Sequence, residues 1–309
     1  APMLMPHWTA GCVGSMEGLY FESATSTPFH FLIQSELSTG PSRAQRNLPY
    51  RSFDLEAGID HLQQFGVPYY AAFSPSAVAE ARNHQDLTEE ATSGPWTVFR
   101  VAGAEAVAAL VAEPAVFDGV GHSGWLEPAV DVFQEGTTAV VRTLGGLDGW
   151  QRVAPGEHPE VRALPEVQVT GIISSVDQVS FTVDRIGVPV LVRTSFFPNW
   201  EADGAVGPWR ATPNLMVVVP TSEEVTLRYG RTPVDVAAIL LTVVGLVALG
   251  VLARRPRPDE PPPAWYDATT LFPAVNARLD AWVDHRIAPP VDHPPQGPDP
   301  VCLAPESRP

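Results

Sequence analysis

The residues best equipped for ligand chemistry stand in one aromatic segment, FFPNWEADGAVGPWR, at positions 196–210. Each of its two tryptophans is followed by a charged residue that can form hydrogen bonds. Flat rings beside such groups suit carbohydrate recognition, so we take Trp200, Glu201, Trp209 and Arg210 as a candidate glycan-binding site. A proline stands one or two residues before each tryptophan, which predicts loop positions and partial exposure for both rings. Packing in a hydrophobic core is the alternative.

A second candidate is the pair Glu17 and Glu22, which brackets the apolar residues 19–21 and could hold a sugar between a carboxylate and a ring. A solvated loop pair is the alternative. The sequence has no HExxH, CxxC, P-loop, GxSxG or dinucleotide-binding motif, and its eight histidines stand singly. We therefore predict no catalytic residue, no cofactor-binding residue and no metal ligand.

Charge and composition exclude one class of partner. All nineteen basic residues are Arg, and the first 232 residues carry thirteen Arg against twenty-six Asp or Glu. A net charge of about −13 repels phosphate backbones, so nucleic-acid binding is not expected.

An uncharged run of eighteen residues, 236–253, is followed at once by Arg254, Arg255 and Arg257. As a helix it is about 27 Å long, close to the roughly 30 Å hydrocarbon thickness of a bilayer. We predict a transmembrane helix over 233–253. The alternative, a buried core helix, lacks large apolar partners in the flanking sequence.

Three arginines follow the apolar run, whereas two, Arg228 and Arg231, precede it. This bias predicts a plasma-membrane protein with residues 1–232 extracytoplasmic and 254–309 cytoplasmic. Cys12 and Cys302 would then lie on opposite sides and could not pair. Either a signal peptide precedes Ala1, or the chain is the C-terminal portion of a multi-span polypeptide.

Upstream of the apolar run the pattern predicts an α+β chain. Leu55, Ile59, Leu62 and Phe65 recur at helical spacing, and Gly66 ends that helix. Strands are expected at 67–73 and 96–101, and further helices at 75–83 and 126–134. From Val167 on, short alternating segments predict antiparallel strands at 167–176, 179–186, 189–196, 215–219 and 225–229.

We thus expect a small α/β unit, then an antiparallel β-sandwich, one transmembrane helix and a Pro-rich, mostly disordered tail with fourteen prolines after Arg255. The expected segments are an irregular aromatic-containing segment 1–50, a small α/β unit 51–103, a mixed connecting region 104–165, a β-sandwich domain 166–231, a transmembrane helix 233–253, and a cytoplasmic tail 254–309 with an amphipathic helix at 274–287.

Several of these segments carry a resemblance. GVPVLVRTSFFPNWEADGAVGPWRATPNLMVVVP (187–220), with VTLRYG before the apolar run, is similar to the last extracytoplasmic β-domain of large bacterial membrane proteins of the GT-C glycosyltransferase and YfhO type. LQQFGVPYYAAF (62–73) and SGPWTVFRVA (93–102) resemble the preceding unit of the same proteins. GSMEGLYFESATSTPFHFL (14–32) resembles actinobacterial polytopic membrane proteins of the 6-pyruvoyl-tetrahydropterin synthase-related family.

The resemblance implies a transferase that uses a polyprenyl-phosphate sugar at the outer membrane face, with an acidic base in its first outer loop. The chain contains neither that loop nor the multi-span core, so no catalytic residue is transferred to it. Isolated histidines supply no zinc set for a pterin-synthase activity.

Two functional hypotheses follow. In the first, the chain is the C-terminal extracytoplasmic and membrane-anchor portion of a multi-pass envelope glycosyltransferase-like protein, not catalytic by itself. Its partners would be membrane lipid and the upstream transmembrane core of the same polypeptide, with envelope glycan as a further candidate. In the second, it is a single-pass membrane-anchored module that binds carbohydrate or protein. A purely structural ectodomain without a ligand is the third reading.

Overall fold

The structure is a computed structural model that describes residues 7, 9, 14, 25–136 and 140–254. The chain divides into two units, residues 16–232 and the remainder, 1–15 with 233–309. Each unit is treated by itself below. The predicted amphipathic helix 274–287 and the pair Glu17 and Glu22 lie outside the described residues.

Two helices begin the first unit, α2 (Thr27–Leu37) and α3 (Leu55–Phe65). The Asp54 carboxylate accepts the Ala57 amide at the start of α3, and Gly66 ends the helix in the left-handed conformation, as its sequence predicts. Helix α2 buries most of its side chains and lies in the segment 1–50, which was expected to be irregular. Its aromatic residues Phe29 and Phe31 are buried and pack the helix onto the core.

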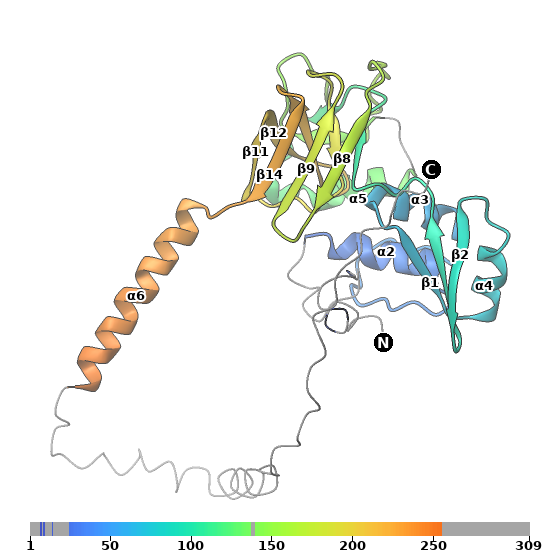
Figure 1. The fold of residues 1–309 in the computed structure, drawn as a ribbon, viewed down its shortest axis with the longest axis horizontal. Helices are drawn as coiled ribbons and strands as arrows, with labels where there is room; N and C mark the ends of the chain where they lie inside the picture. Colours follow the sequence, from blue (N-terminus) through green and yellow to red (C-terminus); the bar gives the residue numbers. More distant parts are fainter. Residues whose placement is uncertain (1–6, 8, 10–13, 15–24, 137–139, 255–309) are drawn as a thin grey trace, which may run out of the picture. The chain divides into compact units, whose positions relative to one another are not determined.

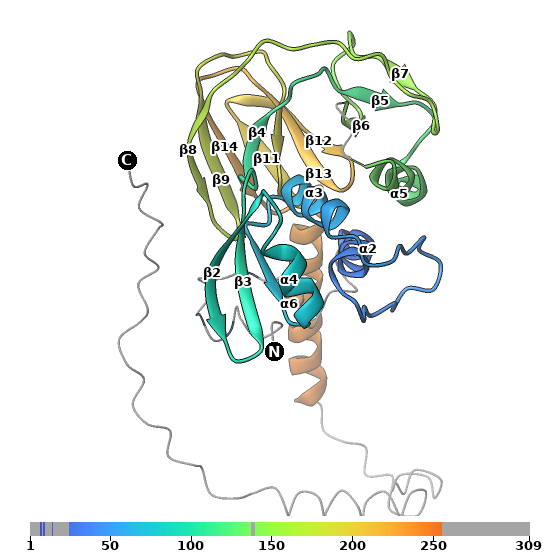
Figure 2. The same cartoon turned by 90° about the vertical axis from the view of Figure 1, so that its right-hand side faces the viewer.

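A three-stranded antiparallel sheet follows, in the order β1 (Tyr69–Ala72), β3 (Trp96–Val101), β2 (Leu87–Ser93). Helix α4 (Pro75–Ala81) lies beside it (Figures 1 and 2). Proline at its first position and Ser74 as N-cap explain where α4 begins. This small α/β unit is the one predicted, with β2 added between α4 and β3.

A seven-stranded mixed sheet has the order β4-β10-β13-β12-β6-β5-β7. Its strands are β4 (Val107–Ala109), β5 (Ala115–Phe117), β6 (Arg142–Leu144), β7 (Arg152–Val153), β10 (Val190–Val192), β12 (Ala205–Ala211) and β13 (Leu215–Pro220). Strand β5 is parallel to both its neighbours, and the other pairs are antiparallel. The short helices η3 (His122–Gly124) and α5 (Leu126–Gln134) lie between β5 and β6 in sequence.

A four-stranded antiparallel sheet completes the sandwich, in the order β11 (Trp200–Asp203), β14 (Glu224–Tyr229), β9 (Gln178–Val183), β8 (Val169–Ser174). Alternation sends Val179, Phe181 and Val183 into a core shared with alternate residues of β10 and β13. The other face of β13, with Leu215, Val217 and Val219, packs into a separate core. All six residues of β13 are therefore buried.

The predicted α+β class, with a small α/β unit followed by a β-sandwich, is confirmed. Residues 104–165, expected to connect the two, supply β4–β7 of the seven-stranded sheet, and residues 16–232 form one compact unit. These strands have two or three residues each, too short for a period-two pattern to be recognised in the sequence.

In the other unit, α6 (Pro233–Ala253) is the one helix of the described residues that is long and apolar enough to cross a membrane. Its mean hydropathy is 2.8, and none of its residues is buried.

Candidate functional site

Trp200 and Glu201 lie on β11 rather than in a loop, and their side chains point to opposite faces of the four-stranded sheet. Trp200 belongs to the sandwich core and is only 6% exposed. Its ring meets that of Tyr229 edge-on, with centroids 5.4 Å apart. The predicted partial exposure of Trp200 is therefore wrong, because pairing of β11 with β14 places it on the inner face.

Trp209 and Arg210 lie on β12, again in a strand instead of the expected loop. Trp209 is partly buried in the second core and packs edge-on against Trp150, with centroids 5.2 Å apart. Arg210 alternates to the other face of the sheet and is 9% exposed. The four predicted residues thus occupy different surroundings, and the two indoles face different cores.

The surroundings of Arg210 are polar but not acidic. Its Nε donates to Asn214 Oδ1 at 2.8 Å, and its guanidinium carbon lies 4.8 Å from the centre of the Trp125 ring. Among the described residues no carboxylate forms an ion pair with it. Burial lowers the pKa of Arg210 to about 10, because the charged form has lost water without gaining an anion. The positive charge of Arg210 is stabilised by the cation–π contact with Trp125 and by hydrogen bonds to neutral groups.

Asn214 extends this network to the N-terminal part of the unit. Its Nδ2 donates to Thr25 Oγ1 at 2.7 Å and to Ser26 Oγ at 3.1 Å. The Ser26 hydroxyl in turn hydrogen-bonds to that of Ser195. The cluster therefore joins the start of α2 to the turn between β12 and β13. Because Asn214 is fully buried, we assign it a structural role.

A buried acid–base pair that the sequence did not indicate joins α2 to α3. Glu36 Oε2 lies 2.6 Å from His61 Nδ1, and their side chains are 0% and 2% exposed. His61 Nε2 lies 3.1 Å from the Phe133 carbonyl oxygen, and the imidazole stacks on the Phe133 ring with centroids 3.7 Å apart. Because a carbonyl only accepts, Nε2 carries a proton, and a second proton lies between Nδ1 and Oε2. No substrate can reach this pair without displacing the core.

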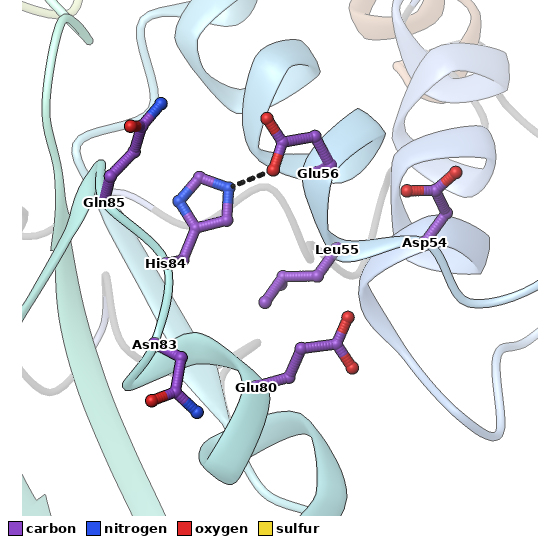
Figure 3. Close-up of a pocket in the computed structure, with 7 residues that line it drawn as sticks. All are labelled: Asp54, Leu55, Glu56, Glu80, Asn83, His84 and Gln85. Atoms are coloured by element: carbon purple, nitrogen blue, oxygen red, sulfur yellow. Dashed lines mark ion pairs between the residues drawn. The ribbon is translucent and has the colours of Figure 1, made fainter.

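An open pocket of about 510 Å³ lies between α3 and the turn after α4 (Figure 3). Its lining is mainly acidic and amide: Asp54, Leu55, Glu56, Glu80, Asn83, His84 and Gln85. The Asp86 amide donates to His84 Nδ1 at 3.2 Å, so the neutral ring carries its proton on Nε2, which faces Glu56 Oε2 at 3.1 Å. Figure 3 shows these two side chains pointing toward each other.

The pocket has an acid–base pair but no reactive partner for it. None of its lining residues is a serine, threonine, cysteine or lysine, so the pair has no adjacent nucleophile to activate. Next to it, burial and then the Glu56 charge raise the pKa of Asp60, as expected where carboxylates gather. The described residues contain no group of three or more His, Cys, Asp or Glu that could hold a metal ion. The arrangement suits a small cationic group.

Comparisons with known proteins add no relatives: no family model, no curated protein and no solved structure matches the chain. The resemblance to envelope membrane proteins therefore stays a prediction.

Proposed function

We propose that the chain is the extracytoplasmic and membrane-anchor portion of a multi-pass envelope glycosyltransferase-like protein that uses a lipid-linked sugar donor. In this proposal the folded unit 16–232 lies outside the plasma membrane, residues 254–309 lie in the cytoplasm, and the reaction takes place on another part of the polypeptide. The observation that carries the proposal is α6, an apolar helix none of whose residues is buried against the described part of the chain.

The surface of α6 supports a lipid environment. Its large apolar side chains are 46–75% exposed, from Ile239 at 46% to Val234 at 75%, and they surround the helix. A helix that is apolar all round is stable only when it is buried in protein or lipid. Twenty-one residues give about 31 Å, enough to cross the hydrocarbon layer. Asp235 lies in the first turn, at the expected depth of the lipid headgroups.

The acid–base pairs support an accessory role for the folded unit. Glu36 and His61 are sealed in the core, and the pocket with Glu56 and His84 has no hydroxyl, thiol or amine nucleophile among its lining residues. Phosphoryl-linked sugar donors are stabilised by cations in transfer reactions, whereas this pocket is acidic. The donor would therefore bind elsewhere, and the sandwich would position an acceptor glycan or the membrane core.

Sidedness and size of the native protein test the proposal. In a chain with Cys12→Ser and Cys302→Ser, we expect a membrane-impermeant maleimide to label Ser222→Cys in intact cells and Ala304→Cys only after lysis. We expect the native polypeptide, by mass spectrometry, to carry several hundred further residues with multiple apolar spans. Labelling of position 304 from outside would reject the orientation.

A single-pass binding module is the second candidate, and one observation favours it. All three hydrophobic cores of the described chain draw their buried residues from positions 29–227, so the folded unit does not depend on α6 for its packing. A native protein that begins near Ala1 would favour this module over the multi-pass protein. The search for a ligand would then use glycan arrays with the intact chain in detergent.

A further inference from the structure

One end of the β-sandwich carries apolar side chains that the fold leaves exposed. Val176, in the turn between β8 and β9, is 98% exposed, the largest exposed fraction among the large apolar side chains that the structure describes. Tyr229, the last residue of β14, is 43% exposed, and Ile173 near the end of β8 is 67% exposed. We call these three exposed residues, Ile173, Val176 and Tyr229, together with the partly buried Phe197, the connector-end patch.

Hydrogen bonds fix these residues at one end of the sheet. The Tyr229 amide donates to the Asp177 carbonyl at 2.8 Å, which ties the β8–β9 turn to the end of β14. Gly230 and Asn199 exchange two hydrogen bonds, and the rings of Phe197 and Tyr229 meet edge-on at 6.3 Å. Figure 1 shows the β8–β9 turn at the end of the sheet where β14 finishes.

Chain connectivity limits how far this end can be from a membrane. Three residues, Gly230, Arg231 and Thr232, separate the end of β14 from Pro233, the first residue of α6. The four Cα-to-Cα steps from Tyr229 to Pro233 span at most about 14 Å even when fully extended. If α6 crosses a bilayer, the end of β14 is held near its surface whatever the angle between sheet and helix.

The chemistry of this end suits the membrane interface more than water. Tyrosine side chains are enriched at the headgroup level of bilayers, which suits the exposed Tyr229, and Val176 occupies a turn where water would favour a polar residue. Arg228, near the end of β14, and Arg231, within the connector, are both exposed, and their charge matches the phosphates of the lipid headgroups.

We propose that the connector-end patch rests in the headgroup region of the lipid bilayer, with Val176 at the deepest point. This inference depends on the proposed function in one respect, namely that α6 spans the membrane. The patch then orients the sandwich on the bilayer in addition to the tether. The opposite end of the sandwich, which carries the β9–β10 turn, faces away from the lipid.

Depth-dependent fluorescence quenching tests the proposal on the full chain. Single cysteines are introduced into the Cys12→Ser, Cys302→Ser background and labelled with an environment-sensitive fluorophore. The chain is reconstituted in vesicles of equal parts phosphatidylethanolamine and phosphatidylglycerol, with nitroxide-labelled lipids at headgroup or deep acyl positions. The labelled positions are Val176→Cys, Ile186→Cys and Leu246→Cys.

Ile186 is the matched control, because it is an exposed apolar residue (53%) in the turn at the other end of β9. The five residue steps of β9 alone place it about 17 Å away along the strand. We expect headgroup nitroxides to quench the label at position 176 several-fold more than the label at 186. Deep nitroxides should quench the label at 246 most strongly.

The outcomes separate this inference from the proposed function. If the label at 246 is quenched and those at 176 and 186 respond equally weakly, α6 spans the bilayer but the connector-end patch does not touch lipid, and the inference is overturned. If the label at 246 is not quenched by deep nitroxides, the membrane-anchor proposal itself fails.

Discussion

Breaking the buried pair of Glu36 and His61 should destabilise the folded unit more than any loss of surface charge. Glu36→Leu would leave His61 Nδ1 without a partner in a site where the side chain is 2% exposed. Removing one member of a buried ion pair costs about 3–5 kcal/mol, because the remaining polar group is desolvated and unpaired. We therefore expect the free energy of unfolding to fall by about 3–5 kcal/mol.

The second carboxylate oxygen makes the double replacement informative. Glu36 Oε1 is buried and has no hydrogen-bond partner among the described residues, so the native pair is only partly satisfied. His61→Phe keeps a ring stacked on Phe133, and together with Glu36→Leu it replaces the pair by apolar groups. Such replacements are often neutral or stabilising. We expect the double variant to be more stable than either single variant, with a coupling energy of at least about 2 kcal/mol.

The measurement is urea unfolding of the full chain in mild detergent, followed by tryptophan fluorescence. With a slope near 2.5 kcal/mol/M, Glu36→Leu should lower the midpoint by roughly 1–2 M. Glu36→Gln is the control: its amide can donate to the neutral imidazole, and the loss should be only about 1 kcal/mol. Single losses below about 1 kcal/mol that simply add in the double variant would refute the buried-pair argument.

Other positions give further tests in the same unfolding assay. Trp200→Ala should cost about 3–5 kcal/mol, because it empties a core site that is 6% exposed; an unchanged midpoint would contradict this burial. Gly146→Ala should cost about 1–3 kcal/mol, since its new Cβ would lie 2.2 Å from the Trp150 ring; a variant with wild-type stability would show that the ring can move. Burial, aided by a nearby glutamate, raises the pKa of Tyr70 to about 12 from 10.0, so its contribution is intact below pH 10 and about 2–3 kcal/mol is lost as pH rises to 12. Tyr70→Phe should flatten that alkaline loss, and equal slopes for both proteins would argue against it. Burial, followed by neighbouring carboxylates, raises the pKa of Asp60, so Asp60→Asn should stabilise the protein at pH 7 and lose this advantage at acid pH, where the native carboxyl is protonated; no gain at pH 7 would count against a raised pKa.

The sequence predicted α3 and β3 correctly, because residues within or next to each element determine where it begins and ends. Helix α3 begins and ends as expected because its cap, Asp54, and its terminator, Gly66, act within a few residues of chain. Strand β3 was predicted with the same bounds, 96–101, because five of its six residues are β-branched or aromatic and favour a strand on their own.

Long-range pairing explains the elements that the sequence did not show. Strand β12 contains Gly207 and Pro208, which favour a turn locally, but β13 and β6 pair with it on either side. This pairing makes Trp209 a strand residue, and pairing of β11 with β14 does the same for Trp200, so the two rings lie in different cores. A proline close to a ring therefore said little about its exposure.

The buried histidine shows where a weak signal existed. His61 lies among the buried residues of α3, beside Ile59 and Leu62, and a histidine on an apolar helix face needs a partner when buried. Its partner, Glu36, is twenty-five residues away and comes from a helix that the sequence did not define. The site could be suspected from α3 alone, but its second member depends on tertiary packing.

The folded unit 16–232 buries its apolar strands, whereas the apolar helix α6 of the other unit is exposed. Within residues 16–232, even a continuous apolar strand such as β13 is covered on both faces by the chain itself. Helix α6 is strongly apolar, and none of its residues is buried in the part of the chain that the structure describes. An apolar helix without cover from protein is stable only in lipid, which is why we propose that α6 spans a membrane. Lipid is the solvent that fits its length, and the exposed Val176 beside the connector is the first place in the folded unit where contact with that lipid can be measured.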